Sequence, residues 1–473
     1  MRFRLCPCHR LPWRPRTHKS IGVMDALFDQ TALTDLADRL VAAARRAGAD
    51  AADAIATRGI SQSVEVRDGT VEESERSEGD DLGLRVFVGH KQAVVSTNDL
   101  SGANAEALAE RAVAMARATP EDRFAGLAEP ELLAKVIPNL DMLDSTLPSV
   151  KALEDMARTA ETAGLAVKGV SKSGGASASA GIGGMVLVTS SGFAHAYLGS
   201  RHGIAMQAIA GEGTGMERDY DYASAIHAAD LEQPEAIGRA AGERAARRLN
   251  PRKVATRKVP VVFEPRVAGS LVGHLASAIN GAAIARGTSF LKDKLGQQIF
   301  RRSIDIIDDP LRKRGLGSHP FDAEGVAGER RALVENGILK TWILDCATAR
   351  ELGLKTTGHA HRGVSTTPSP GPSNLHLAPG AVTAKELIED IADGFYVTDL
   401  IGMGANMVTG DYSRGASGFW IERGELTYAV SEITIAGHLN EIFASLMPAN
   451  DLKFRYGTNA PTIRVEGLTV AGI

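Results

Sequence analysis

Residues 263–289 read FEPRVAGSLVGHLASAINGAAIARGTS, and the organisation of the chain is clearest from this stretch. Pro265 suits the first turn of a helix, where its missing N–H is not needed. Leu271 and Leu275 recur at helical spacing, which predicts a helix over 268–285 with one buried face. The many Gly and Ala residues allow another backbone to approach closely, as in a tightly packed core or the floor of a site.

Composition narrows the class of protein. The 473 residues are 44% hydrophobic and 23% charged, with a net charge of -4, which predicts a globular chain of two to three domains. No basic excess exists outside the first twenty residues, so nothing favours a nucleic-acid binder. No apolar run approaches the roughly 18 residues that a membrane span needs. Fifty glycines favour a β-rich protein with many tight turns.

The cysteines and the start of the chain carry little further information. Cys6, Cys8 and Cys346 cannot form a disulfide framework, so we expect a reducing, cytoplasmic location. Cys6-x-Cys8 followed by His9 lacks a second ligand pair at useful spacing, which makes a metal knuckle a weak interpretation. Residues 1–23 are basic, without any acidic residue, and we expect either an extended gene start or a disordered tail.

The order of predicted elements indicates an α+β fold rich in antiparallel sheet. Residues 24–118 read as a small domain of helix, β-meander and helix, and residues 119–232 as a middle domain with a second meander. Residues 233–473 read as a large antiparallel β domain with flanking helices. The Ser/Gly-rich stretch 171–184 is interpreted as the first strand of the second meander, with a flexible linker or a phosphate-binding loop as alternatives.

Two local motifs predict defined turns and caps in the C-terminal half. Asn336-Gly337 between apolar runs predicts a β-hairpin with a type I′ turn. Thr383 and Glu386 form the sequence of a capping box, which predicts a helix that ends at Gly394.

Several long and unusual stretches carry a resemblance to a known family. They are STTPSPGPSNLHL at 365–377, GFYVTDLIGMGANMVTGDYSRGASGFWIERGE at 394–425 and NDLKF at 450–454. These stretches resemble the TldD/PmbA family, whose members pair as two related subunits, TldD and TldE (also called PmbA). The resemblance covers about residues 24–473.

The resemblance places a motif on the helix described first. In TldD this helix carries H-E-x-x-x-H, two metal ligands and a catalytic glutamate. Gly287-Thr288-Ser289 sets the register, which puts the two histidine positions at Val272 and Ser277 and the glutamate position at Gly273. None of these residues can ligate zinc or act as a base, and His274 is out of register. The chain therefore resembles the TldE/PmbA branch.

The resemblance implies a heterodimeric, cytosolic zinc metallopeptidase that acts on unfolded or leader peptides. Zinc and the glutamate base would belong to the TldD partner, and this chain would hold no cofactor, contact no membrane and bind no nucleic acid directly. An older name of the family is modulator of DNA gyrase. Two alternatives stay open: a peptide-binding adaptor homodimer without hydrolysis, and an independent hydrolase that uses Ser413 or Cys346.

Other candidate ligands and nucleophiles are weaker. His359-x-His361 could place two imidazoles on one face of a strand, with His376 as a third ligand, but the pair lies in a Gly-rich stretch. Cys346 has histidines downstream but no local signature of a catalytic cysteine, and buried packing is its commoner role.

The last candidate is a contact surface. Residues 410–418 are bounded by glycines and read as a loop that exposes Tyr412, Ser413 and Arg414. Together with His274, these side chains are expected to meet the partner subunit or the peptide. A tight turn between two strands is the equally simple alternative.

Overall fold

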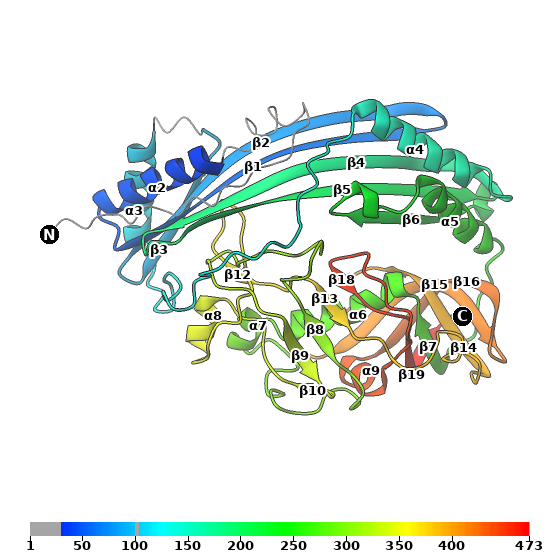
Figure 1. The fold of residues 1–473 in the computed structure, drawn as a ribbon. Coiled ribbons are helices and arrows are strands. Elements are labelled where there is room, and N and C mark those ends of the chain that lie inside the picture. Colours follow the sequence, from blue (N-terminus) through cyan, green and yellow to red (C-terminus); the bar gives the residue numbers. More distant parts are fainter. Residues whose placement is uncertain (1–29, 100–103, 473) are drawn as a thin grey trace.

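A long, curved antiparallel sheet dominates the computed structural model, which describes residues 30–99 and 104–472. Figure 1 shows this sheet arching over the C-terminal part of the chain. Its strand order is β3-β2-β1-β4-β5-β6, and every neighbouring pair is antiparallel. Its strands are β1 (Ala51–Arg67), β2 (Thr70–Val88), β3 (Lys91–Thr97), β4 (Val170–Thr189), β5 (Ala194–Ala210) and β6 (Glu217–Ala225).

The pairing of β1 with β4 makes the first and second meanders one sheet. It runs from Asp53↔Thr189 to Val66↔Ala176, so the segments predicted as 24–118 and 119–232 share one hydrogen-bonded layer. The Ser/Gly-rich stretch 171–184 lies within β4, which confirms its interpretation as a strand. Four glycines cross the sheet in direct register, namely Gly79, Gly59, Gly183 and Gly199.

Helices cover the outer, convex face of this sheet at both ends (Figure 1). At one end Leu36 and Leu40 of the helix α2 (Gln30–Arg46) share a core with Leu84 and Val86 of β2, since residues four apart lie on one face of a helix. No helix of the described residues is both long and apolar enough to span a bilayer. The covering helices are α2 (Gln30–Arg46) and α3 (Ala105–Ala118) at this end, and α4 (Val150–Leu165) and α5 (Pro234–Arg247) at the other.

The C-terminal part is built on a second six-stranded sheet with the order β16-β15-β14-β7-β19-β17. An additional pairing of β16 with β19 curls this sheet on itself. Together the two large sheets and their helices confirm the predicted α+β class. The strands are β7 (Arg257–Phe263), β14 (Asp393–Ile401), β15 (Asp411–Glu422), β16 (Glu425–His438), β17 (Met447–Pro448) and β19 (Ile463–Ala471).

A five-stranded sheet with the order β10-β9-β8-β13-β18, a two-stranded sheet of β11 and β12, and four helices complete the described part of this region. The hairpin between β9 and β10 turns at Asn336 and Gly337, both at positive φ, which confirms the predicted type of turn. The elements are β8 (Ile306–Asp308), β9 (Arg331–Glu335), β10 (Ile338–Leu339), β11 (Ala360–His361), β12 (Ser369–Pro370), β13 (Leu375–Leu377), β18 (Thr458–Asn459), α6 (Pro265–Ala278), α7 (Gly281–Ala285), α8 (Cys346–Glu351) and α9 (Leu439–Ser445).

The prediction of a helix from Thr383 to Gly394 is wrong. The capping box does form, because Thr383 N donates to Glu386 Oε2 at 2.6 Å and Glu386 N donates to Thr383 Oγ1 at 3.2 Å. The chain then continues as turns rather than as an α-helix. The carbonyl of Ile391 accepts from the N–H of Gly424 at 2.8 Å, in the turn between β15 and β16, so this end of the segment is bonded to another element.

The helix predicted over 268–285 is divided. The first helix, α6, ends at Ala278, and Asn280 then caps α7 by accepting from the N–H of Ala282 at 3.0 Å. The Asn280 side chain also donates to the carbonyl of Pro370 at 2.7 Å. Asparagine bonded in this way competes with a continuous helix, which is the physical reason for the break.

Candidate functional site

The helix α6 starts where the central strand β7 leaves the second sheet. The N–H of Glu264 donates to the carbonyl of Val397 on β14 at 3.0 Å, and Pro265 follows in the first turn. Leu271 and Leu275 lie on the buried stripe of α6. On another side, a Cβ added at Gly269 would stand 3.1 Å from the carbonyl oxygen of Thr458, so glycine allows α6 to lie close to β18.

The three motif positions have three different environments. Val272 is 2% exposed and belongs to the large core of the C-terminal part. Gly273 faces open space, since a Cβ added there would meet no atom within 4 Å. Ser277 is exposed, and its hydroxyl donates to the Gly273 carbonyl of its own helix at 3.0 Å. None of these groups is a usable zinc ligand or a base.

His274 and Tyr412 form the polar contact next to these positions. Their rings meet edge to face with centroids 5.9 Å apart. Burial and the positive charge of Arg414 lower the pKa of His274 to about 4, so this imidazole is neutral at pH 7. Burial also raises the pKa of the Tyr412 hydroxyl. His274 Nε2, the Tyr412 hydroxyl and Arg414 Nε find no hydrogen-bond partner among the described residues.

The prediction of an exposed loop at 410–418 is wrong. Residues from Asp411 onward belong to β15, and Tyr412 is only 1% exposed. Alternation along the strand turns Tyr412 inward and leaves Ser413 exposed. The glycines serve close packing: a Cβ added at Gly418 would lie 1.9 Å from the carbonyl oxygen of Tyr396.

The predicted contact residues are thus brought together in part. His274, Tyr412 and Arg414 share one polar contact that α6 and β15 hold, whereas the hydroxyl of Ser413 has no hydrogen bond to a described residue. A neutral imidazole, a phenol and a guanidinium can donate hydrogen bonds to a carbonyl or a carboxylate. They do not form a nucleophile with its base, because no carboxylate or thiol of the described residues joins them.

His359 and His361 belong to a different polar cluster. His359 is buried, with Nε2 3.2 Å from Asp308 Oδ2, and the hydroxyl of Ser373 donates to the same Asp308 oxygen at 2.5 Å. Burial would raise the pKa of Asp308, but these bonds outweigh it and hold that pKa below its usual value. His361 packs edge to face on His319, with ring centroids 5.6 Å apart.

His376 lies apart from this cluster in its contacts, since Nδ1 meets the Asn374 carbonyl at 3.3 Å and its ring packs against Phe454. Within residues 30–99 and 104–472, no three His, Cys, Asp or Glu side chains are placed to hold a metal ion.

Cys346 is a packed residue at the start of α8. It is 2% exposed, and its N–H donates to Glu324 Oε2 at 2.8 Å. Burial, with the nearby carboxylates of Glu324 and Asp322, raises the pKa of this thiol, so the thiolate is disfavoured.

One buried ionic network joins the long sheet to the C-terminal part. Arg85 of β2 donates to Asp53 of β1 at 2.5 and 3.0 Å, and Arg362 makes an ion pair with the other Asp53 oxygen at 2.7 Å. Burial alone would raise the pKa of Asp53, but Arg362 and Arg85 hold it below its usual value. Charged residues inside apolar strand sequences, such as Asp53 among alanines, were the available signal for this network.

A second network fixes the start of α6 to the other end of the sheet. Arg266 donates to Asp219 of β6 at 2.9 Å and to the Tyr220 carbonyl at 2.8 Å. Arg248 after α5 lies 3.4 Å from the same Asp219 and donates to Ser417 of β15 at 2.7 Å. The helix that carries the motif positions is therefore anchored to both parts of the chain.

Comparison with known proteins agrees with this architecture. Three models of PmbA/TldA metallopeptidase domains match the chain: domain 1 at 52–116, the central domain at 144–249 and the C-terminal domain at 256–472. Metalloprotease PmbA of Escherichia coli is 37% identical over 425 residues, covering 89% of this chain and 92% of that protein. A Metalloprotease PmbA homolog of Haemophilus influenzae is 36% identical over 434 residues, which cover 91% of this chain and 94% of that protein.

Solved structures share the fold over nearly the full length. A proposed modulator of DNA gyrase from Bacteroides thetaiotaomicron has a TM-score of 0.86 and 27% identity, over 93% of this chain and 98% of that one. TldE from Thermococcus kodakarensis has a TM-score of 0.83 at 20% identity, over 92% and 100% of the two chains, and shows the shared fold alone. From these matches and the arrangement around α6, the chain belongs to the PmbA/TldD family of metallopeptidases.

Proposed function

We propose that this chain is the TldE/PmbA-type subunit of a two-subunit peptidase and supplies no catalytic group itself. The observation that carries the proposal is the composition of α6. Val272 is packed in the core, Gly273 has no side chain, and the Ser277 hydroxyl is bonded to its own helix. Zinc does not fit these residues, because none offers an imidazole, a thiolate or a carboxylate.

The catalytic groups would then come from a TldD-type partner. Such a partner would supply the zinc, the two histidines and the glutamate that activates water for attack on a peptide carbonyl. This chain would contribute its preserved fold, in which His274 and Tyr412 pack against each other beside the motif positions. Unfolded or leader peptides in the cytoplasm are the proposed substrates.

A cleavage assay tests whether the catalytic groups come from the partner subunit rather than from this chain. An unstructured fluorogenic peptide is incubated with this chain alone, with a TldD-type subunit of the same organism alone, and with both. We expect cleavage only in the mixture, and its loss when the partner's motif glutamate is replaced by Gln. His274→Ala in this chain should reduce cleavage modestly or not at all, because the reacting groups lie elsewhere.

Zinc analysis gives an independent readout. We expect no stoichiometric zinc in the purified chain. One zinc per chain, lost in His359→Ala or His361→Ala, would contradict the proposal. Robust cleavage by the lone chain, blocked by a serine or thiol reagent, would instead identify an independent hydrolase. Peptide binding without cleavage, with or without a partner, would identify an adaptor.

A further inference from the structure

Part of β2 has a neighbouring strand on one side only. The strand β1 pairs with β2 from Thr70 to Phe87, whereas β3 pairs with it only from Leu82 onward. Residues 70–81 therefore form a free sheet edge among the described residues. An open edge offers a row of backbone donors and acceptors that another strand can pair with.

This edge is also uncovered on both faces. Every residue from 70 to 79 is exposed, as is Asp81, and Asp80 is half-buried. The side chain of Val71 is 40% exposed. Natural sheets keep such edges short, cover them or place charged side chains on them, so the charges of this edge decide which strand can pair with it.

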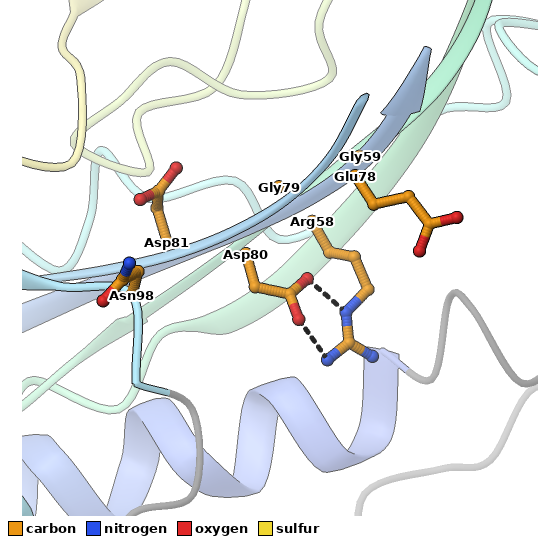
Figure 2. A pocket seen from close by; sticks show the side chains of 7 residues that line it. All are labelled: Arg58, Gly59, Glu78, Gly79, Asp80, Asp81 and Asn98. Carbon is orange, nitrogen blue, oxygen red and sulfur yellow. Dashed lines mark hydrogen bonds and ion pairs between the residues drawn. The ribbon is translucent and has the colours of Figure 1, made fainter. Parts of the chain in front are cut away.

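The acidic side chains differ between the two faces of the edge. On the outer face, Asp80 is paired with Arg58 at 2.7 Å, and Glu78 with Arg76 at 2.7 Å. Figure 2 shows Asp81 pointing to the opposite side of the sheet from the Arg58–Asp80 pair, and all three residues line a pocket of about 450 Å³ at this edge.

The opposite side is the concave face, which the arch turns toward the C-terminal part. Gly83 lies on the same face as Asp81 by alternation, and a Cβ added at Gly83 would stand 1.9 Å from the Val364 carbonyl oxygen. Glu73 and Glu75 share this face with Asp81. None of these three carboxylates has an ion pair with a described residue.

This pattern excludes one occupant and favours another. A second copy of the chain paired through the same edge would bring the acidic rows together, and like charges opposite each other destabilise a strand pair. A strand with Lys or Arg at alternate positions would instead neutralise Glu73 and Glu75 on one face, while its backbone completes the edge.

We propose that residues 70–81 pair with an extended, basic strand of the partner subunit, so that the long sheet continues across the subunit boundary. The inference rests on the proposed two-subunit function. It also gives a reason for pairing with a different subunit rather than with a second copy, because the acidic edge repels itself and attracts a basic one.

The test combines hydrogen exchange with charge reversal. The wild-type chain, the triple variant Glu73→Lys/Glu75→Lys/Asp81→Lys and a control triple variant, Glu110→Lys/Asp293→Lys/Glu425→Lys, are each titrated with a TldD-type subunit of the same organism. The control positions are exposed acids on other elements and carry the same change in charge. We expect amides of 70–81 to become protected in the wild-type complex, the edge variant to bind about tenfold more weakly or worse, and the control to bind normally.

Each other outcome overturns the inference in a distinct way. If the wild type binds the partner while 70–81 stays unprotected, or the edge variant binds as tightly, the edge assignment fails and the proposed function stands. If the wild type binds no partner, both fail. Self-association that protects 70–81 would assign the edge to a second copy, and protection by a free basic peptide alone would assign it to substrate. Unchanged exchange of β1 and β4 shows that the variants are folded.

Discussion

At the scale of single residues, the contact of His274 with Tyr412 is the most informative feature near the motif positions. A histidine whose folded pKa is lowered stays neutral in the folded chain while the unfolded chain takes up a proton. For His274 this difference extends from about pH 6.5 down to its folded pKa of about 4. Stability is therefore lost as the pH falls through that window, and His274→Gln should lose less on acidification, as measured by melting temperatures at pH 6.5 and 4.5.

Burial is the larger cause of the lowered pKa of His274, and the smaller contribution of Arg414 can be tested separately. Arg414 lies close enough to His274 to disfavour the imidazolium. In histidine-labelled protein, the NMR signal that disappears in His274→Gln should titrate near pH 4. Arg414→Ala should raise that midpoint toward 6.5, whereas removing the exposed charge in Lys258→Ala should not. A wild-type midpoint near 6.5 would show that the ring is hydrated and that the contact with Tyr412 is loose.

At the scale of one element, α6 contains two glycines in contrasting surroundings. Glycine inside a helix costs about 0.5–1 kcal/mol relative to alanine. Gly273→Ala should therefore stabilise the chain by about that amount, because the new methyl group meets no atom within 4 Å. Gly269→Ala should gain less or lose, since its Cβ would stand 3.1 Å from the Thr458 oxygen.

Urea unfolding of the two variants decides this point. A smaller or negative effect at Gly269 would confirm that β18 limits how large a residue α6 can carry there. Equal stabilisation at both positions would mean that β18 moves aside. Destabilisation by Gly273→Ala would mean that another group covers the motif position in solution.

The elements also show what sequence can and cannot predict. Helical spacing predicted the buried stripe of α6, and Asn336-Gly337 predicted the hairpin of β9 and β10. Both signals are local in the sequence. The first part of β15, residues 411–417, was missed, because its glycines look like a loop in the sequence, whereas a strand was predicted over 418–422. The free part of β2 is exposed on both faces, so it has no alternation from which its length could be predicted.

For the candidate site too, the features with a local sequence signal were predicted and those that depend on contacts between distant residues were not. The resemblance set the register of Val272, Gly273 and Ser277 from a local motif. The contact of His274 with Tyr412 joins residues far apart in the sequence, and no single-sequence pattern reports such a contact. The strand pairing of β1 with β4 is hidden for the same reason, since more than a hundred residues separate their partners.

At the scale of the whole molecule, the buried network of Asp53 holds the long sheet on the C-terminal part. Asp53 makes an ion pair with both Arg85 and Arg362, so Asp53→Asn would leave two buried guanidinium groups with one more distant carboxylate, Glu324, 3.9 Å from Arg85. Removing one partner of a buried ion pair costs about 3–5 kcal/mol. We expect a loss of that size in the free energy of unfolding.

Two further variants show whether charge balance is the cause. Arg362→Met leaves the ion pair of Asp53 with Arg85 in place, so it should cost clearly less than Asp53→Asn. Asp390→Asn removes an exposed partner of Arg464, and a surface pair contributes only about 0–1 kcal/mol. Urea unfolding should therefore rank the losses Asp53→Asn, Arg362→Met, Asp390→Asn. A loss for Arg362→Met equal to that for Asp53→Asn would mean that the contact between the two parts, rather than the balance of buried charge, sets the cost.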